Sequence, residues 1–372
     1  MDQRKLIVVS AVNFTEGGPL SILKDCLSHA SARLADRFRI LALVHDRDLL
    51  GEMAGVEFLE FPQAKRSWLL RLYHEWVRFH RLSIELQPFL WLSLHDITPR
   101  VRAERRAVYC HNPAPFWKMK PAEALLDPSF AVFNRFYDLV YRINIAQNDW
   151  VIVQQDWLRR EFRARYPVRN IIVAHPSVPA VEGIPSGAGP AHGSRTFFFP
   201  AYPRFFKNIE VIGDAARILM KQGRTDFEVR ITLDGTENHY ARKLAQQYGD
   251  VPALRFIGLQ SRHRIYELYR ETDCLVFPSR LETWGLPLSE FKQFGKPILA
   301  ADLPYAHETV GQYGQVRFFD PVDAQALASR MAEFLDGRLR FDHNEAGTPP
   351  PPYAADWDAL LDILVSGGAQ GP

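Results

Sequence analysis

The feature that most constrains this chain is a regular alternation of short apolar runs with longer segments of helical spacing. Strands that are buried on both faces of a sheet appear as continuous apolar runs, and helices between such strands indicate a parallel α/β sheet. The runs predict strands at Lys5–Ser10, Phe38–His45, Phe89–Leu94, Ala107–Cys110, Val151–Gln154, Thr196–Pro200, Phe227–Leu233, Leu254–Ile257, Cys274–Pro278 and Pro297–Ala300.

The alternation is interrupted once. In residues 176–193, glycine and proline supply eight of eighteen positions and no periodicity remains, which is typical of an interdomain linker. A chain of 372 residues is also long enough for two domains of about 100–200 residues. We therefore predict a first α/β domain over 1–175, a linker over 176–193, a second α/β domain over 194–345, and a tail over 346–372 with a helix at 354–364.

Composition excludes several protein classes. Apolar residues make up 47% of the chain and charged residues 24%, as in a soluble globular protein and unlike a disordered or collagenous one. No apolar run approaches the roughly 20 residues that span a bilayer, and the N-terminus does not resemble a signal peptide. The three cysteines lie far apart without CxxC spacing, which argues against disulfides and thiolate zinc. We expect a cytoplasmic protein.

The net charge of +2 conceals an imbalance between the two halves. Residues 1–175 carry 25 Lys and Arg against 19 Asp and Glu, whereas the remainder carries 20 against 24. An excess of +6 is small for a nucleic-acid binder, so we expect no nucleic-acid partner. The excess indicates either an ordinary solvated face or a surface that meets something anionic.

The segment FPSRLETWGLPLSE, residues 277–290, is the most informative one. The strand should end at Pro278, and a helix should begin near Pro287, where proline costs no hydrogen bond. Unpaired backbone N–H groups around Gly285 would then form an anion site. Two carboxylates, Glu282 and Glu290, flank it. If all helical, they would be separated by roughly 12 Å, which exceeds the roughly 5–9.5 Å of glycosidase pairs. The arrangement suits a nucleotide sugar, or else two solvated glutamates flank an ordinary helix start.

Two basic residues follow the first strand of the second domain. Arg204 and Lys207 could close on one diphosphate, with arginine acting as a planar fork and lysine as a compact charge. They would stabilise a departing nucleoside diphosphate without a metal ion. Alternatively, Lys207 and Asn208 only open a helix and remain solvated.

The first domain offers weaker candidates. Gly17 and Gly18 follow its first strand and would let backbone amides approach a ligand, although they do not form the GxGxxG pattern. His111 follows another strand, where open α/β sheets place ligand contacts, although a lone histidine is more often structural. Asp46 and Asp48 have DxD spacing but no nearby third ligand, so we predict no metal site.

Together these segments resemble the retaining glycosyltransferases of the GT-B fold, and most closely the bacterial enzymes of glycosyltransferase family 4 that build surface polysaccharides. The family's mark is two glutamates separated by seven residues, which Glu282 and Glu290 match. The resemblance covers most of 196–330. Over 1–175 it rests on the first strand with its glycine pair and on the YCHNP segment at 109–113.

The resemblance implies two Rossmann-like domains that face each other across a cleft, with the acceptor mainly on the first domain and the nucleotide sugar on the second. It also implies that the C-terminal helix returns to the first domain. Glu290 should hold the ribose hydroxyls, and Glu282 the hydroxyls of the transferred sugar. His111 should contact that sugar near its anomeric carbon.

The same resemblance assigns the diphosphate. It should be held by Arg204, Lys207 and the backbone of Thr283, Trp284, Gly285 and Leu286, with Gly17 and Gly18 beneath it. Many relatives have a wider gap between the two basic residues than the two residues seen here. Which basic residue touches which phosphate therefore stays open.

The implied reaction transfers a hexose with retention of anomeric configuration and without a divalent metal or other cofactor. No residue is suited to act as a covalent nucleophile, so we predict same-face attack in which a leaving phosphate oxygen takes the acceptor's proton. Mannose from a GDP donor is preferred by family similarity, with rhamnose or glucose donors close behind, and the acceptor is expected to be a polysaccharide or a lipid-linked glycan. A nucleotide-sugar epimerase of GT-B fold and a non-catalytic nucleotide-sugar-binding subunit are the alternatives.

Residues 65–82 are basic and aromatic at helical spacing. We expect one stripe to pack on the sheet (Leu69, Leu72, Trp76 and Phe79) and another to face outward (Trp68, Arg71, Arg78 and Arg81). The outer set would suit anionic lipid headgroups at the inner face of the cytoplasmic membrane, or it forms a solvated basic face.

Overall fold

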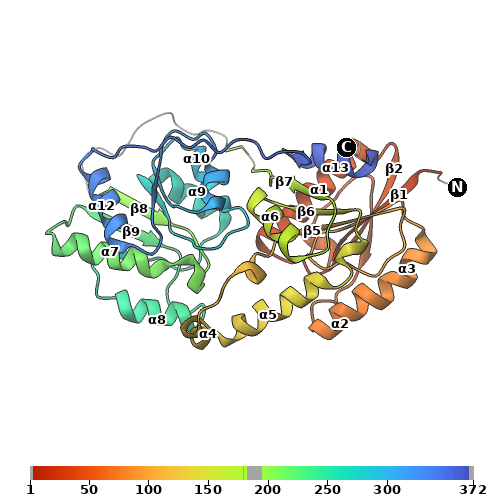
Figure 1. Cartoon of the computed structure of the whole chain (residues 1–372), viewed down its shortest axis with the longest axis horizontal. Coiled ribbons are helices and arrows are strands. Elements are labelled where there is room, and N and C mark those ends of the chain that lie inside the picture. The colour runs from red at the N-terminus through yellow and green to blue at the C-terminus, as the bar shows by residue number, and fades with distance from the viewer. Residues whose placement is uncertain (1–2, 179, 182–194, 368–372) are drawn as a thin grey trace. The chain divides into compact units, whose positions relative to one another are not determined.

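The computed structural model describes residues 3–178, 180–181 and 195–367. Its contacts divide the chain into two compact units, each with its own sheet (Figure 1). Unit 1 comprises Met1–Trp117, Val132–Ser177 and Pro349–Pro372, and unit 2 comprises Lys118–Ala131 and Val178–Thr348. Both units are α/β with parallel sheets, which confirms the predicted fold class.

Unit 1 contains an eight-stranded sheet in the order β14-β7-β6-β5-β4-β1-β2-β3, with all paired neighbours parallel. Its strands are β1 (Lys5–Ala11), β2 (Phe38–Val44), β3 (Val56–Glu60), β4 (Leu90–Ser93), β5 (Arg105–Cys110), β6 (Trp150–Val153), β7 (Ile171–Ala174) and β14 (Tyr353–Ala354). Successive residues of β1 belong to different cores: Ile7 lies in one cluster and Val8 in another. Because side chains alternate along a strand, both faces of this sheet are covered.

The helices of unit 1 lie on these two faces. They are α1 (Gly17–Leu34), α2 (Trp68–Tyr73), α3 (Phe79–Leu86), α5 (Pro128–Arg142), α6 (Asp156–Arg165) and α13 (Trp357–Ser366). The division between the units falls within α5, whose first residues group with unit 2.

Unit 2 contains a six-stranded parallel sheet in the order β10-β9-β8-β11-β12-β13. Its strands are β8 (Arg195–Phe199), β9 (Phe227–Ile231), β10 (Leu254–Phe256), β11 (Cys274–Phe277), β12 (Ile298–Ala301) and β13 (Val316–Phe319). Its helices are α4 (Pro121–Leu126), α7 (Ile209–Lys221), α8 (His239–Tyr248), α9 (Arg262–Glu271), α10 (Leu286–Lys292), α11 (Pro304–Val310) and α12 (Ala324–Leu335).

The strand orders identify where ligands should bind. In unit 2 the chain builds outward from β8 through β9 to β10, and then returns to place β11 on the other side of β8. In unit 1 the equivalent reversal lies between β1 and β4. Ligands of open α/β sheets bind beyond the carboxyl ends of the strands at such switch points.

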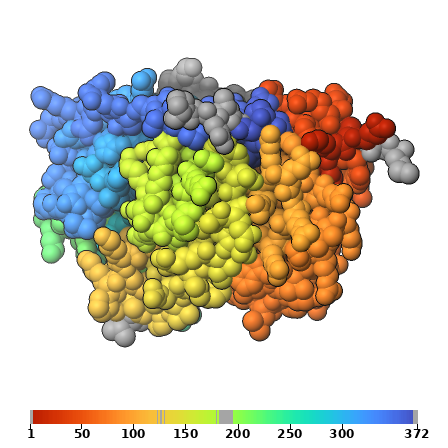
Figure 2. Space-filling view, turned by 45° about the vertical axis from the view of Figure 1, so that its right-hand side comes forward, coloured from red at the N-terminus to blue at the C-terminus, as the bar shows by residue number. Residues whose placement is uncertain are grey.

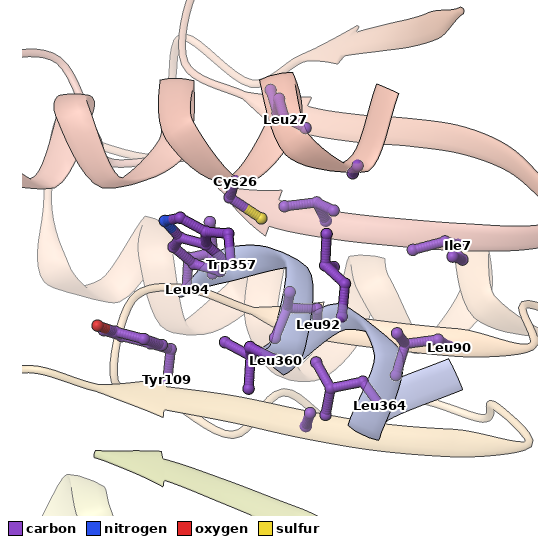
Figure 3. Packing of buried hydrophobic residues seen from close by; sticks show 14 of the residues in the cluster. Ile7, Cys26, Leu27, Leu90, Leu92, Leu94, Tyr109, Trp357, Leu360 and Leu364 are labelled. Carbon is purple, nitrogen blue, oxygen red and sulfur yellow. The ribbon is translucent and has the colours of Figure 1, made fainter. Parts of the chain in front are cut away.

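The C-terminal helix α13 packs into the core of unit 1. Figure 3 shows Trp357, Leu360 and Leu364 pointing toward β4 and β5, with α1 on their other side. The Trp357 ring stacks on Tyr109 with 5.8 Å between ring centroids. The preceding strand β14 extends the sheet by pairing with β7. Unit 1 is therefore completed by β14 and α13.

The division of the chain corrects the predicted domain boundaries at one place. Residues 118–131 were assigned to the first domain, but they group with unit 2. Phe130 shows why, because its ring packs 5.0 Å from that of Phe205 and 5.6 Å from that of Phe206. Most of the predicted linker 176–193 lies outside the described residues.

The structure also corrects the predicted helix over 65–82. A π-helical turn at His74–Arg78 separates α2 from α3 and rotates the faces. Leu69, expected to be packed, is 80% exposed, whereas Arg71, expected outside, is 7% exposed. No helix within the described residues is both long enough and apolar enough to span a membrane.

Candidate active site

The residues predicted from the second half of the sequence meet at the switch point of unit 2. Arg204 and Lys207 lie in the loop after β8, and Glu282 lies in the loop after β11. These two strands are neighbours in the sheet, so their carboxyl ends bring the loops together.

Lys207 and Glu282 form an ion pair. The Lys207 Nζ donates to Glu282 Oε1 at 2.5 Å, and the two side chains are only 19% and 13% exposed. A charge-assisted hydrogen bond with little access to water is stronger than a surface ion pair. The pair thus holds one cation and one carboxylate in fixed positions at the mouth of the switch point.

Asn208 fixes the loop that carries Lys207. It adopts a left-handed conformation with φ of 59°, which asparagine tolerates better than most residues. Its Nδ2 donates to the carbonyls of Pro278 at 3.1 Å and Pro321 at 2.7 Å. The sequence suggested only that Asn208 opens a helix; the structure shows that it also ties the β8 loop to the end of β11.

Glu290 lies in α10 and is 9% exposed. Its Oε2 accepts a hydrogen bond from the Tyr269 hydroxyl at 3.0 Å, and Arg262 lies 3.8 Å from its Oε1. Burial, followed by the charge of Glu290, raises the pKa of Tyr269 well above its usual value, so the hydroxyl remains a donor. Tyr269 was not predicted as a site residue, because it comes from a helix far away in sequence.

The loop from Thr283 to Leu286 requires glycine at one position. Gly285 has φ of +83°, and a Cβ there would lie 3.3 Å from Phe277. The N–H of Leu288 donates to the Gly285 carbonyl at 2.9 Å, and Pro287 has no N–H. The N–H of Leu288 is therefore engaged, whereas the N–H groups of Gly285 and Leu286 donate to no backbone carbonyl among the described residues.

Trp284 faces the protein interior. Its indole N–H donates to Ser289 Oγ at 2.8 Å, and its carbonyl accepts from the Thr309 hydroxyl. The residue is 7% exposed. Its predicted contact with a nucleotide sugar can therefore involve only the main chain.

Carboxylates of the 118–131 segment lie against two arginines, Arg204 in the site and Arg280 in the loop after β11. Arg204 NH1 lies 3.6 Å from Asp127 Oδ2, and Arg280 NH1 lies 3.5 Å from Glu123 Oε1. The Arg204 side chain is still 43% exposed. An incoming anion would therefore meet a cation that retains access to solvent.

His111 lies at the switch region of unit 1 and is held by Asp96. The Asp96 carboxylate accepts hydrogen bonds from the backbone N–H of His111 at 2.7 Å and from the hydroxyls of Tyr137 at 3.0 Å and Tyr141 at 2.9 Å. The imidazole Nδ1 of His111 lies 3.7 Å from the same carboxylate. Asp96 was missed at the sequence level, where its position after the strand 89–94 was the available signal.

A cavity of about 490 Å³ opens beside His111, and residues of unit 1 line it. Glu16 and Pro19 contribute to its wall, next to the glycine pair. Gly17 has φ of +64°, and nothing lies within 4 Å of a Cβ built at Gly18. The predicted glycine loop therefore stands at the edge of an open space, while the Glu282 group belongs to unit 2.

No group of three or more His, Cys, Asp or Glu residues in the described part of the chain is arranged to hold a metal ion. The three cysteines are buried, and burial raises the pKa of the Cys110 and Cys274 thiols well above its usual value.

Comparison with known proteins gives the site a context. Residues 188–347 match the family model described as Glycosyl transferases group 1. Over 127 residues the chain is 30% identical to the D-inositol 3-phosphate glycosyltransferase of Thermomonospora curvata, covering 33% of this chain and 29% of that protein. Over 130 residues it is 25% identical to the O-antigen chain mannosyltransferase B of Escherichia coli, covering 35% and 34%. The chain thus spans about a third of the length of the curated relatives it matches.

The fold has a solved counterpart. The structure of WaaG, a glycosyltransferase involved in lipopolysaccharide biosynthesis, matches with a TM-score of 0.63 at 15% identity, covering 98% of this chain and 100% of that one. This likeness confirms the GT-B class of fold. The candidate residues Arg204, Lys207, Glu282 and Glu290 all lie within the segment that matches the family model.

Proposed function

We propose that this protein is a retaining, metal-independent glycosyltransferase of family 4 that moves a hexose from a nucleoside diphosphate sugar to a glycan acceptor. The observation that carries the proposal is the half-buried Lys207–Glu282 pair, in the same loops as Arg204 and Gly285, at a switch point within the matched segment. It combines donors for a diphosphate with an acceptor for sugar hydroxyls. Fold likeness alone would not separate transfer from epimerisation or simple binding.

The proposed donor site assigns one chemical role to each group. Arg204, Lys207 and the amides of Gly285 and Leu286 bind the diphosphate, because cations and unpaired N–H groups favour anionic oxygens. Glu282 accepts hydrogen bonds from the transferred sugar. Glu290 accepts hydrogen bonds from the ribose, and the Tyr269 hydroxyl keeps its carboxylate oriented.

The reaction breaks the bond between the anomeric carbon and the diphosphate oxygen. The acceptor oxygen forms its new bond on the same face, and its proton passes to the departing phosphate oxygen, so atoms and charge balance. Arg204 and Lys207 offset the negative charge that develops on the leaving group. On the family resemblance, His111 contacts the transferred sugar near its anomeric carbon.

Mannose is the proposed sugar, with GDP as its carrier. Similarity to a mannosyltransferase that acts on an O-antigen chain supports this choice and supports a surface polysaccharide or lipid-linked glycan as the acceptor. The matching stretch is about a third of that relative's length.

We further propose that unit 1 contacts anionic lipid at the inner face of the cytoplasmic membrane. Leu69 is 80% exposed and Tyr73 is 49% exposed on α2, and Val132 on α5 is 71% exposed. These helices are neighbours, since the Trp68 ring packs 5.3 Å from that of Phe136. The part of the chain that includes α2 and α3, coloured orange, lies at the molecular surface in Figure 2.

Basic residues border this apolar surface. Arg66, Arg78, Arg81 and Arg135 are exposed on or beside the same helices. Apolar side chains with an arginine border suit the headgroup region of an anionic bilayer. Co-sedimentation with anionic vesicles at low salt tests this: binding that falls with added salt is expected, and no binding would refute it.

The enzyme proposal is tested by measuring donor binding and turnover together. Purified protein is screened by thermal shift against GDP, UDP, dTDP and their common sugars, with EDTA present. A ligand at about 100 times its Kd should raise the free energy of unfolding by about 2.7 kcal/mol. Nucleoside diphosphate release is then measured for the selected donor, with Lys207→Ala and Glu282→Ala as test variants. Lys221→Ala, at an exposed lysine on α7, is the matched control.

The outcomes separate the alternatives. A base-selective shift with release that both site variants abolish supports the proposal. A shift without any release indicates a binding subunit, and conversion of the sugar without transfer indicates an epimerase. Unchanged release in both Lys207→Ala and Glu282→Ala would overturn the assigned site.

A further inference from the structure

The cavity in unit 1 contains a buried arginine whose charge is not neutralised by a carboxylate. Arg71 lines this cavity and is 7% exposed. Its guanidinium donates to the His95 carbonyl at 2.8 Å and approaches His95 Nδ1 at 3.4 Å. Its Nε has no hydrogen-bond partner. Across the described residues, no carboxylate oxygen lies within 4.0 Å of this guanidinium.

A buried cation without a counter-charge is costly, so its retention requires a reason. One carboxyl that interacts with its charge is Glu75, one turn along the chain, which is fully buried and lies 3.2 Å from His95 Nε2. Burial raises the pKa of Glu75 to about 8, although the charge of Arg71 opposes the rise. At neutral pH Glu75 is therefore mostly protonated and leaves Arg71 without an anion.

The other carboxylates of the cavity are already engaged. Asp96 accepts hydrogen bonds from the hydroxyls of Tyr137 and Tyr141 and from two backbone N–H groups. Glu16 lies 3.9 Å from Lys65, which also donates to the Thr15 hydroxyl. An anion entering the cavity would thus meet Arg71 without displacing an existing ion pair.

The cavity also offers surfaces for a sugar ring. The Arg71 guanidinium lies 4.9 Å from the Trp68 ring centroid, and Trp68 is 38% exposed. Phe133 and Tyr137 line the same cavity. The side-chain oxygen of Asn13, also in the lining, is buried without a partner. Aromatic faces with unpartnered polar atoms suit a carbohydrate.

We propose that this cavity binds an anionic group, a phosphate or a carboxylate, carried by the glycan acceptor, with Arg71 as its counter-charge and Trp68 as a stacking surface for the adjoining sugar. The inference rests on the proposed transferase function, because it assigns a charged acceptor to that reaction. The acceptor is then held beside His111, which lines the same cavity.

The probes are glucose 1-phosphate and glucuronate, with glucose as the neutral match, titrated by NMR or calorimetry into the whole protein. The variants are Arg71→Gln and Arg71→Lys, with Arg163→Gln, an exposed arginine on α6, as control. Both charged sugars, or one of them, should bind more tightly than glucose. Arg71→Gln should weaken that binding about 10- to 100-fold, as expected for a hydrogen bond to a charged group, and Arg71→Lys should weaken it less. The two probes show whether phosphate or carboxylate is preferred.

Nucleoside diphosphate binding is measured on the same samples and keeps the two proposals distinguishable. Undiminished diphosphate binding in Arg71→Gln, together with lost binding of the charged sugar, supports the inference. Charged sugars that bind no better than glucose, or that bind equally to Arg71→Gln, overturn it while leaving the donor site intact. A parallel loss of diphosphate binding would assign the anion to the donor and also overturn it. If Arg71→Gln does not fold, Trp68→Ala and Lys65→Gln replace it, and unchanged binding in both refutes the inference.

Discussion

Glu75 offers a stringent test of the buried polar cluster in unit 1. Its carboxyl is fully buried, and its pKa rises from 4.5 to about 8 mainly because burial disfavours the charged form. The folded state therefore binds this proton about 5 kcal/mol more tightly than the unfolded state does. Between pH 4.5 and about 8 the unfolded chain has lost the proton while the folded chain retains it.

The sign of the pH dependence follows from this difference in bound protons. The free energy of unfolding falls as pH rises through that window, by at most about 1.4 kcal/mol per pH unit, and changes no further above it. Glu75→Gln keeps the shape of the protonated acid but cannot ionise. The stability of the variant relative to the native protein should therefore rise with pH, by up to about 5 kcal/mol in total.

Urea denaturation at pH 5, 6, 7 and 8 measures this difference, and hydrogen exchange of β1 and β4 reports on unit 1 specifically. Glu85→Gln, at an exposed carboxyl on α3, is the matched control and should show no such trend. The pKa of His95 is lowered by burial and by Arg71, so its contribution is lost as pH falls below its usual value of 6.5, a trend of opposite sign that is confined to the lower part of the pH range. A stability difference that stays constant from pH 5 to 8 would refute the buried neutral Glu75.

Three further changes test other parts of the structure. Gly285→Ala should lower the melting temperature of unit 2 by about 2–8 °C, because φ of +83° strains any side chain and the new Cβ would press on Phe277; an unchanged melting curve would contradict this. Tyr269→Phe removes the donor to Glu290, so nucleoside diphosphate affinity measured by calorimetry should fall about 5- to 10-fold with little change in melting temperature, and equal affinity would argue against a ribose contact. Trp357→Ala should lower the free energy of unfolding by about 3–5 kcal/mol in denaturant titrations, and an unchanged value would show that α13 is dispensable for unit 1.

The sequence predicted most of the strands that form continuous apolar runs. It identified β1 and β11 because their residues are buried on both faces of the sheet. It missed β3, β13 and β14, which lie at sheet edges and are partly exposed or only two residues long. It also missed β7, although β7 is fully buried and has four residues, as β11 does. A short apolar run cannot be assigned to a strand by periodicity alone.

The helix faces over 65–82 were mispredicted for a geometric reason. The buried positions Arg71, Glu75, Phe79 and Ser83 repeat every four residues. A step of four residues overshoots one turn of an α-helix by about 40°, so such a stripe drifts around a regular helix. The π-helical turn at His74–Arg78 absorbs the drift. A regular helical projection could not place Arg71 inside. Three of the four buried positions are polar, so hydrophobicity did not reveal the repeat either.

The candidate site residues also fall into two groups: those that the sequence identified, and those whose role depends on which strands are neighbours. Lys207 and Glu282 were recognisable because each follows a predicted strand, but their ion pair depended on β8 and β11 being neighbours, which the order of elements along the chain does not reveal. Asn208 and Tyr269 were not assigned site roles, because their bonds join segments between 21 and 113 residues apart. Strand order is therefore the missing information in both units. Once it is known, the polar residues that follow the two strands at each reversal converge on one place: Lys207 and Glu282 in unit 2, and the cavity residues Asn13 and Asp96 in unit 1.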